Sequence, residues 1–301
     1  MSAPDSLKSI LFAFFANLSI AVAKGLAALF TGSGAMLAET IHSLADSGNQ
    51  LLLILGLRQT RHPPTTDYPL GFGKIIYFWS FLVALILFSI GGMFSLYEGT
   101  HKLLHPTPLS YPWVAIFVLL FAIAAESVSL WGCMREVNKE RHGRSLARWF
   151  RESRSSALIV VFGEDVAALA GLVLALGAVV ATLMTNDPFW DAVGTLSIGA
   201  LLIVVALFIA VEIKGLLIGQ SVDALLLDEM RRFLKNQPQV KTVFNLLTLQ
   251  FGPDVMVAVK AQMEPQVTDR ELVRVINLTE AAFRSRFPSV RWLFFEPDDR
   301  D

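Results

Sequence analysis

Three ionisable side chains repeat at helical spacing inside one hydrophobic segment. Glu39 stands three residues before His42, and Asp46 stands four residues after it. On a helix these intervals place all three side chains on one face. An imidazole nitrogen and a carboxylate oxygen one turn apart form a workable pair of metal ligands. His42 and Asp46 are therefore candidate ligands for a metal ion.

A second hydrophobic segment carries an adjacent acidic pair, Glu164 and Asp165. Neighbouring residues on a helix point about 100° apart. Only one of the two can aim squarely at a point shared with His42 and Asp46, so the other needs a different partner or stays protonated. A structural hydrogen-bonded pair is the alternative for His42 and Asp46 taken alone. Because ionisable groups within a membrane are costly, this many of them favours a functional ion site.

Other polar residues in the hydrophobic segments are less specific. Lys24 could neutralise Glu164 or extend toward the membrane surface, and Glu126 is ambiguous in the same way. Asn17 is expected to hydrogen-bond between helices.

The composition and the segment lengths indicate a membrane protein. Of the 301 residues, 54% are hydrophobic and 17% are charged, whereas soluble proteins carry roughly a quarter charged residues. About 20 apolar residues cross a bilayer. The stretches that qualify are residues 7–30, 35–57, 75–97, 113–134, 157–184 and 189–211. They predict an all-α six-helix transmembrane bundle in a lipid bilayer. No basic stripe with interleaved aromatic residues suggests a nucleic-acid partner.

Lysine and arginine are concentrated in two of the connections between these stretches, and the remaining connections contain only Lys102. Basic loops remain on the cytosolic side, so we expect both termini to be cytoplasmic. The residues concerned are Arg58, Arg61, Lys74, Arg135, Lys139, Arg141, Arg144, Arg148, Arg151 and Arg154.

The composition changes after the last stretch, and residues 213–301 follow the bundle of residues 1–212 as a separate cytosolic domain. Alternating and amphipathic patterns predict a helix at 223–237 and strands at 240–251 and 255–263. Thr268 and Glu271 form a capping box that opens a second helix, and 290–296 forms a third strand. This order, αββαβ, predicts an α+β ferredoxin-like domain.

Several segments resemble the cation diffusion facilitators, a family of metal/proton antiporters that includes zinc transporters. The resemblance covers nearly the whole chain and depends most on the segment from Ser33-Gly34-Ala35 through Glu39 and His42 to Asp46. It is supported by Gly71-Phe72-Gly73-Lys74, by Glu164-Asp165 and by Leu216-Leu217-Ile218-Gly219-Gln220-Ser221.

The resemblance implies a transport site formed by His42, Asp46 and Asp165. Many members have His or Asp four residues before that last aspartate, but this chain has Val161. The fourth position is then open to water or to Glu164. One nitrogen with carboxylates suits zinc first, with iron, cobalt and manganese also possible.

The family implies export of the metal from the cytosol in exchange for protons, by a homodimer, here in a bacterial inner membrane. The metal is the substrate, and we expect no cofactor and no small organic substrate. No histidine follows His142, so the cytosolic domain is expected to dimerise without a metal cluster. The alternative is a non-transporting scaffold or metal sensor with a partner-binding cytosolic domain. An enzyme is not expected, because neither HExxH nor GxSxG is present.

Overall fold

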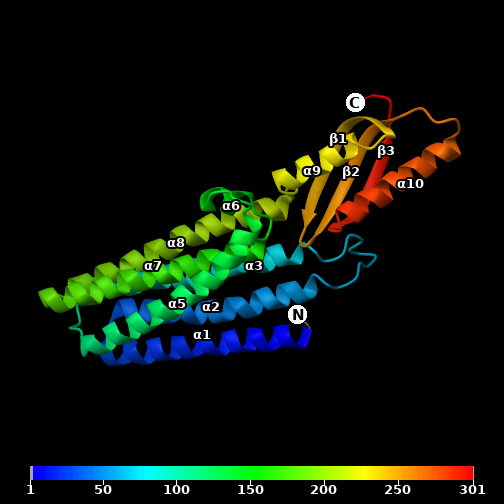
Figure 1. Ribbon diagram of the computed structural model, residues 1–301. Helices are drawn as coiled ribbons and strands as arrows, with labels where there is room; N and C mark the ends of the chain where they lie inside the picture. The colour runs from blue at the N-terminus through cyan, green and yellow to red at the C-terminus, as the bar shows by residue number, and fades with distance from the viewer. Residues whose placement is uncertain (1–2, 301) are drawn as a thin grey trace. The chain divides into compact units, whose positions relative to one another are not determined.

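The computed structural model describes the backbone of residues 3–300 and the side chains of residues 17–300 (Figure 1). The chain forms two compact units. A helical unit contains the residues up to Leu57 together with Trp79–Arg144 and Ala157–Ile213. The second unit contains Arg58–Phe78, Ser145–Ser156 and the residues from Lys214 onward. Segments of the second unit therefore interrupt the helical unit along the chain.

Long helices form the helical unit and extend in similar directions in Figure 1. The third of these segments is continuous, but its helix type changes along its length: a π-helical stretch, η1, joins the α-helices α3 and α4. In chain order the segments are α1 (Ala3–Thr31), α2 (Gly34–Gln59), α3 (Ile75–Ile86) with η1 (Leu87–Met93) and α4 (Phe94–Leu104), α5 (Pro112–Glu140), α7 (Ser156–Thr185) and α8 (Phe189–Ile218).

Within the described residues, four helical segments are long and apolar enough to cross a membrane: Ile75–Leu104, Pro112–Glu140, Ser156–Thr185 and Phe189–Ile218. The part of α1 whose side chains are described contributes a shorter apolar stretch, Asn17–Thr31. α2 is more polar because it carries Glu39, His42 and Asp46. The predicted hydrophobic segments all lie within long helices.

Two features of the connections were not predicted. The third helical segment continues to Leu104, seven residues past the predicted end at 97, so Lys102 lies in α4 and not in a loop. A short helix, α6 (Leu146–Glu152), forms in the basic connection before α7. The Ser145 side chain caps α6 by accepting a hydrogen bond from the Arg148 amide, and Trp149 is fully buried. Ser145 with apolar residues at 146, 149 and 150 was a readable helix signal.

In the second unit, the predicted αββαβ order is found as α9 (Ala224–Lys235), β1 (Val240–Phe251), β2 (Asp254–Met263), α10 (Asp269–Arg286) and β3 (Val290–Pro297). Thr268 caps α10 through a 3.2 Å bond from the Glu271 amide, as the capping box predicts. The sheet order is β1-β2-β3, with β1 antiparallel and β3 parallel to β2. That this domain has the ferredoxin-like fold stays a prediction.

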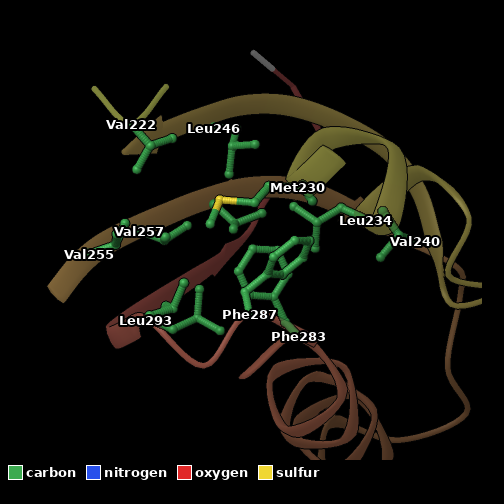
Figure 2. Close-up of a cluster of buried hydrophobic side chains, with 13 residues drawn as sticks. Val222, Met230, Leu234, Val240, Leu246, Val255, Val257, Phe283, Phe287 and Leu293 are labelled. Atoms are coloured by element: carbon green, nitrogen blue, oxygen red, sulfur yellow. The ribbon is translucent and has the colours of Figure 1, made fainter. Parts of the chain in front are cut away.

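One face of this sheet is covered by α9 and α10 and forms the core shown in Figure 2. The predicted inward face of β2 is buried there, with Val255 1%, Val257 0% and Val259 2% exposed. Side chains at alternate positions point to the opposite face. Leu247 of β1 and Phe294 of β3 lie there and are 62% and 57% exposed.

Candidate metal site

α2 places its three ionisable residues along one face, as their spacing predicts. Glu39 and His42 are fully buried, and the Asp46 side chain is 16% exposed. Nε2 of His42 lies 3.5 Å from Oδ2 of Asp46. Nδ1 of His42 and Oδ1 of Asp46 are buried without a hydrogen bond. These atoms are therefore not committed to a structural partner and remain available as ligands.

α7 directs its adjacent acids toward two different helices. Oε1 of Glu164 accepts a 2.6 Å hydrogen bond from Nδ2 of Asn49 on α2. Oδ1 of Asp165 accepts a 3.3 Å bond from Oγ of Ser129 on α5, while its Oδ2 is buried without a hydrogen bond. Because neighbouring helical residues point about 100° apart, only one of the two acids bonds to α2, and it is Glu164, not Asp165.

A small cavity of about 20 Å³ lies between these groups. This volume is enough for roughly one water-sized occupant. Its wall contains the acids Asp46, Glu126, Glu164 and Asp165 together with Asn17, Ser43, Gln50 and Val161. The structure therefore gathers Asp46, Glu164 and Asp165 around one space, with Val161 beside them, and His42 contacts the group through Asp46.

These side chains do not form a finished coordination cage. Among the described residues, no group of three or more His, Cys, Asp or Glu side chains is close enough to hold a metal ion. The site consists instead of clustered acids and uncommitted ligand atoms around a small space. Binding a dication there requires the side chains to converge.

Lys24 belongs to a buried network with Glu39 and with Ser43, which also lines the cavity. Its Nζ donates to Oγ of Ser43 at 2.7 Å and lies 3.3 Å from Oε2 of Glu39. Lys24 and Glu39 are both fully buried. The suggestion that Lys24 neutralises Glu164 is wrong, because its ammonium is engaged by Glu39. Extension to the membrane surface is excluded by the same burial.

Gly171 of α7 makes room for this ion pair. A Cβ at that position would lie 2.3 Å from Oε1 of Glu39. The absence of a side chain lets α7 approach the Glu39 carboxylate closely. Glu39 therefore has its charge compensated by Lys24 and does not line the cavity, unlike Asp46, Glu164 and Asp165.

Sequence reasoning missed Asn49 and Gln50 as members of this region. Both continue the face of Asp46, at three and four residues beyond it, so their helical spacing was a usable signal. Ser129 could not be found this way, because its contact with Asp165 joins residues on different helices.

Comparison with known proteins places this arrangement in a family. Residues 10–218 match the family model described as the cation efflux transmembrane domain. The chain is 32% identical over 231 residues to the mitochondrial proton-coupled zinc antiporter of Xenopus laevis, covering 76% of this chain and 41% of that protein. It is 29% identical over 225 residues to metal tolerance protein C4 of Arabidopsis thaliana, covering 74% and 49% of the two chains.

A bacterial relative aligns over most of both chains. Magnetosome protein MamB of Paramagnetospirillum magneticum is 25% identical over 283 residues, which cover 93% of this chain and 90% of that protein. By contrast, the chain spans less than half the length of the animal and plant relatives. The protein is an integral membrane protein of the cation diffusion facilitator family, as the sequence motifs indicated.

Proposed function

We propose that this chain exports divalent transition-metal cations from the cytosol in exchange for protons. The observation that carries the proposal is the gathering of Asp46, Glu164 and Asp165 around one buried cavity, next to His42. Acidic groups at this depth are costly unless they serve an ion or proton path. The relative named as a proton-coupled zinc antiporter supports the same activity.

The metal ligands in this proposal are His42, Asp46 and Asp165, with Glu164 as a fourth ligand or a proton carrier. His42 and the carboxylates must be unprotonated to bind a dication, so metal binding releases protons at the site. Zinc is the first expected substrate, because imidazole combined with carboxylate oxygen suits it. Iron, cobalt and manganese are the next expected substrates.

The membrane arrangement in this proposal has six spans, formed by α1, α2, the segment from α3 to α4, α5, α7 and α8. α2 crosses in spite of its polar residues because Lys24 compensates Glu39, and its other acid, Asp46, faces the small cavity. The basic connections place both termini in the cytosol. We propose a bacterial inner membrane as the location.

The cytosolic domain, residues 213–301, is proposed to join two copies of the chain. Its uncovered sheet face presents a row across the strands in which Leu247, Ala258 and Phe294 are neighbours. This row and the adjoining Lys260 line part of a hollow. An apolar face of this kind gains stability when a second copy covers it. The domain has no histidine, so its dimerisation should not need metal.

Zinc uptake into inside-out membrane vesicles tests the transport proposal. Vesicles containing the full chain should accumulate zinc, and faster when a pH gradient supplies protons from the interior. Asp46→Ala should abolish uptake. Ser47→Ala is the matched control, because the Ser47 hydroxyl bonds only to the Ser43 carbonyl one turn back. Parental uptake by Asp46→Ala would refute the site. Uptake of no dication by the wild-type chain would favour a scaffold or sensor.

A further inference from the structure

Asp191, in the first turn of α8, ties together the start of α2 and the end of α4. Its side chain is only 3% exposed. It accepts a 2.5 Å hydrogen bond from Oγ of Ser33 and a 2.8 Å bond from the backbone amide of Gly34, with a weaker 3.4 Å bond from the Ala35 amide. The first amides of a helix have no partner within that helix. A carboxylate from another helix therefore caps α2.

Lys102 of α4 completes this contact. Its Nζ lies 2.8 Å from Oδ2 of Asp191 and also donates to the carbonyl of Gly32. Gly34 permits the close approach, because a Cβ there would lie 2.7 Å from Cδ of Lys102 and 2.9 Å from Oγ1 of Thr195. We call the set Ser33, Gly34, Lys102 and Asp191 the clasp.

The clasp lies at the start of α2, whereas the acidic cavity lies about halfway along it. Gly34 begins the helix, whereas Asp46 and Gln50, which line the cavity, lie in its middle and second half. At 1.5 Å per residue, Asp46 is about 18 Å further along the axis than Gly34. In the orientation set by the basic loops, the clasp lies at the extracytosolic end of α2, and the cavity lies nearer to the cytosol than the clasp does.

A transporter must close one side of its site while the other side is open. In this structure the cavity lies among the candidate ligands Asp46 and Asp165, about halfway along α2. The first turn of α2 is held by a largely buried ion pair and two short hydrogen bonds. We propose that the clasp is the extracytosolic gate, with Asp191 as a positioning residue that holds α2 in the cytosol-facing state. This inference rests on the proposed transport function.

Opening of the gate would separate α2 from α8 and α4. A change that weakens the clasp should therefore raise the population of the outward-facing state. Apparent affinity scales with the populated fraction of the competent state. The KM for zinc should then rise at the cytosolic face and fall at the opposite face. A residue needed only for folding would not shift the two values in opposite directions.

The test measures zinc KM in inside-out and right-side-out membrane vesicles containing the full chain. Asp191→Asn and Lys102→Met should each change the ratio of the two KM values about tenfold or more, by the population argument. Asp187→Asn is the matched control, because Asp187 is exposed in the connection just before α8, where its carboxylate accepts a bond from the nearby Phe189 amide. An unchanged ratio in both clasp variants, or equal changes at both faces, would overturn the gate.

A second measurement uses the wild-type chain and does not depend on variants that fold. Hydrogen exchange at the Gly34 and Ala35 amides reports directly on their bonds to Asp191. Exchange there should change when zinc is added, and unchanged exchange in a protein that transports zinc would overturn the gate. A wild-type chain that transports no dication at either face would instead refute the proposed function, and the gate with it.

Discussion

Asn49 lies one helical turn beyond Asp46, and its side-chain amide donates a 2.6 Å hydrogen bond to the carboxylate of Glu164. This bond joins α2 to α7 inside the helical unit and holds Glu164 at the wall of the acidic cavity. Its sequence neighbour Asp165 bonds to Ser129 of α5 instead. The two acids thus reach the same cavity from different directions, and each can be tested separately.

Glu164→Gln isolates the charge of Glu164. The glutamine carbonyl can still accept the bond from Asn49, so the packing of α2 against α7 should persist. Loss of a negative charge beside the dication should raise the zinc KM roughly tenfold, equivalent to about 1.4 kcal/mol. Zinc uptake measured at several pH values should also show a weaker pH dependence. Unchanged KM and pH dependence would leave Glu164 as a packing residue.

His42→Asp tests whether the imidazole selects the metal. His42 is the one nitrogen ligand proposed for the site, so the variant would offer oxygen atoms alone. Oxygen ligands suit manganese, whereas imidazole suits zinc, cobalt and iron. The rate of zinc uptake relative to manganese should fall about tenfold, the effect of a difference of roughly 1.4 kcal/mol. His142→Asp, at an exposed position after α5, is the control. The same preference in both variants would remove His42 from the ligand set.

The buried pair Lys24 and Glu39 predicts a non-additive loss of stability. Removing one partner leaves an uncompensated buried charge, which costs about 3–5 kcal/mol. Lys24→Met should therefore lower the melting temperature of the detergent-purified chain. Adding Glu39→Gln should restore part of the loss, because it removes the remaining charge. Additive losses in the double variant would show that the two residues do not act as a pair.

Local patterns predicted the elements, because each pattern reports on neighbours within a few residues. The spacing of Glu39, His42 and Asp46 was sufficient to place them on one buried face, and Thr268 with Glu271 marked the start of α10. Within the part of the chain that the structure describes, both predictions agree with the observed helices. Helix ends were less accurate, since α4 continues through Lys102.

Contacts between distant segments could not be read in this way. Ser33 and Asp191 are separated by 158 positions in sequence, and nothing in either local pattern connects them. The partner of Lys24 was misassigned for a similar reason. Several acids lay within plausible reach, and only the packing of α1 against α2 selects Glu39 over Glu164. Tertiary packing, not helical spacing, determines which charges meet.

The uncovered sheet face predicts where two copies of the chain should meet. Phe294 of the edge strand β3 is 57% exposed on this face and neighbours Ala258 of β2, which in turn neighbours Leu247 of β1. A lysine at 294 would place a charge within the proposed contact, where covering it with apolar surface is costly. Phe294→Lys should therefore convert the proposed dimer of the full chain in detergent to a monomer, measured by light scattering coupled to size exclusion.

The control for this substitution is Val267→Lys, because Val267 is 91% exposed in the connection after β2 and lies outside the strands. It should leave the dimer intact. Added zinc should not change the dissociation caused by Phe294→Lys, since residues 213–301 contain neither histidine nor cysteine. A dimer that persists in Phe294→Lys at the same protein concentration would locate the contact between copies elsewhere, and a wild-type chain that is monomeric would exclude the contact altogether.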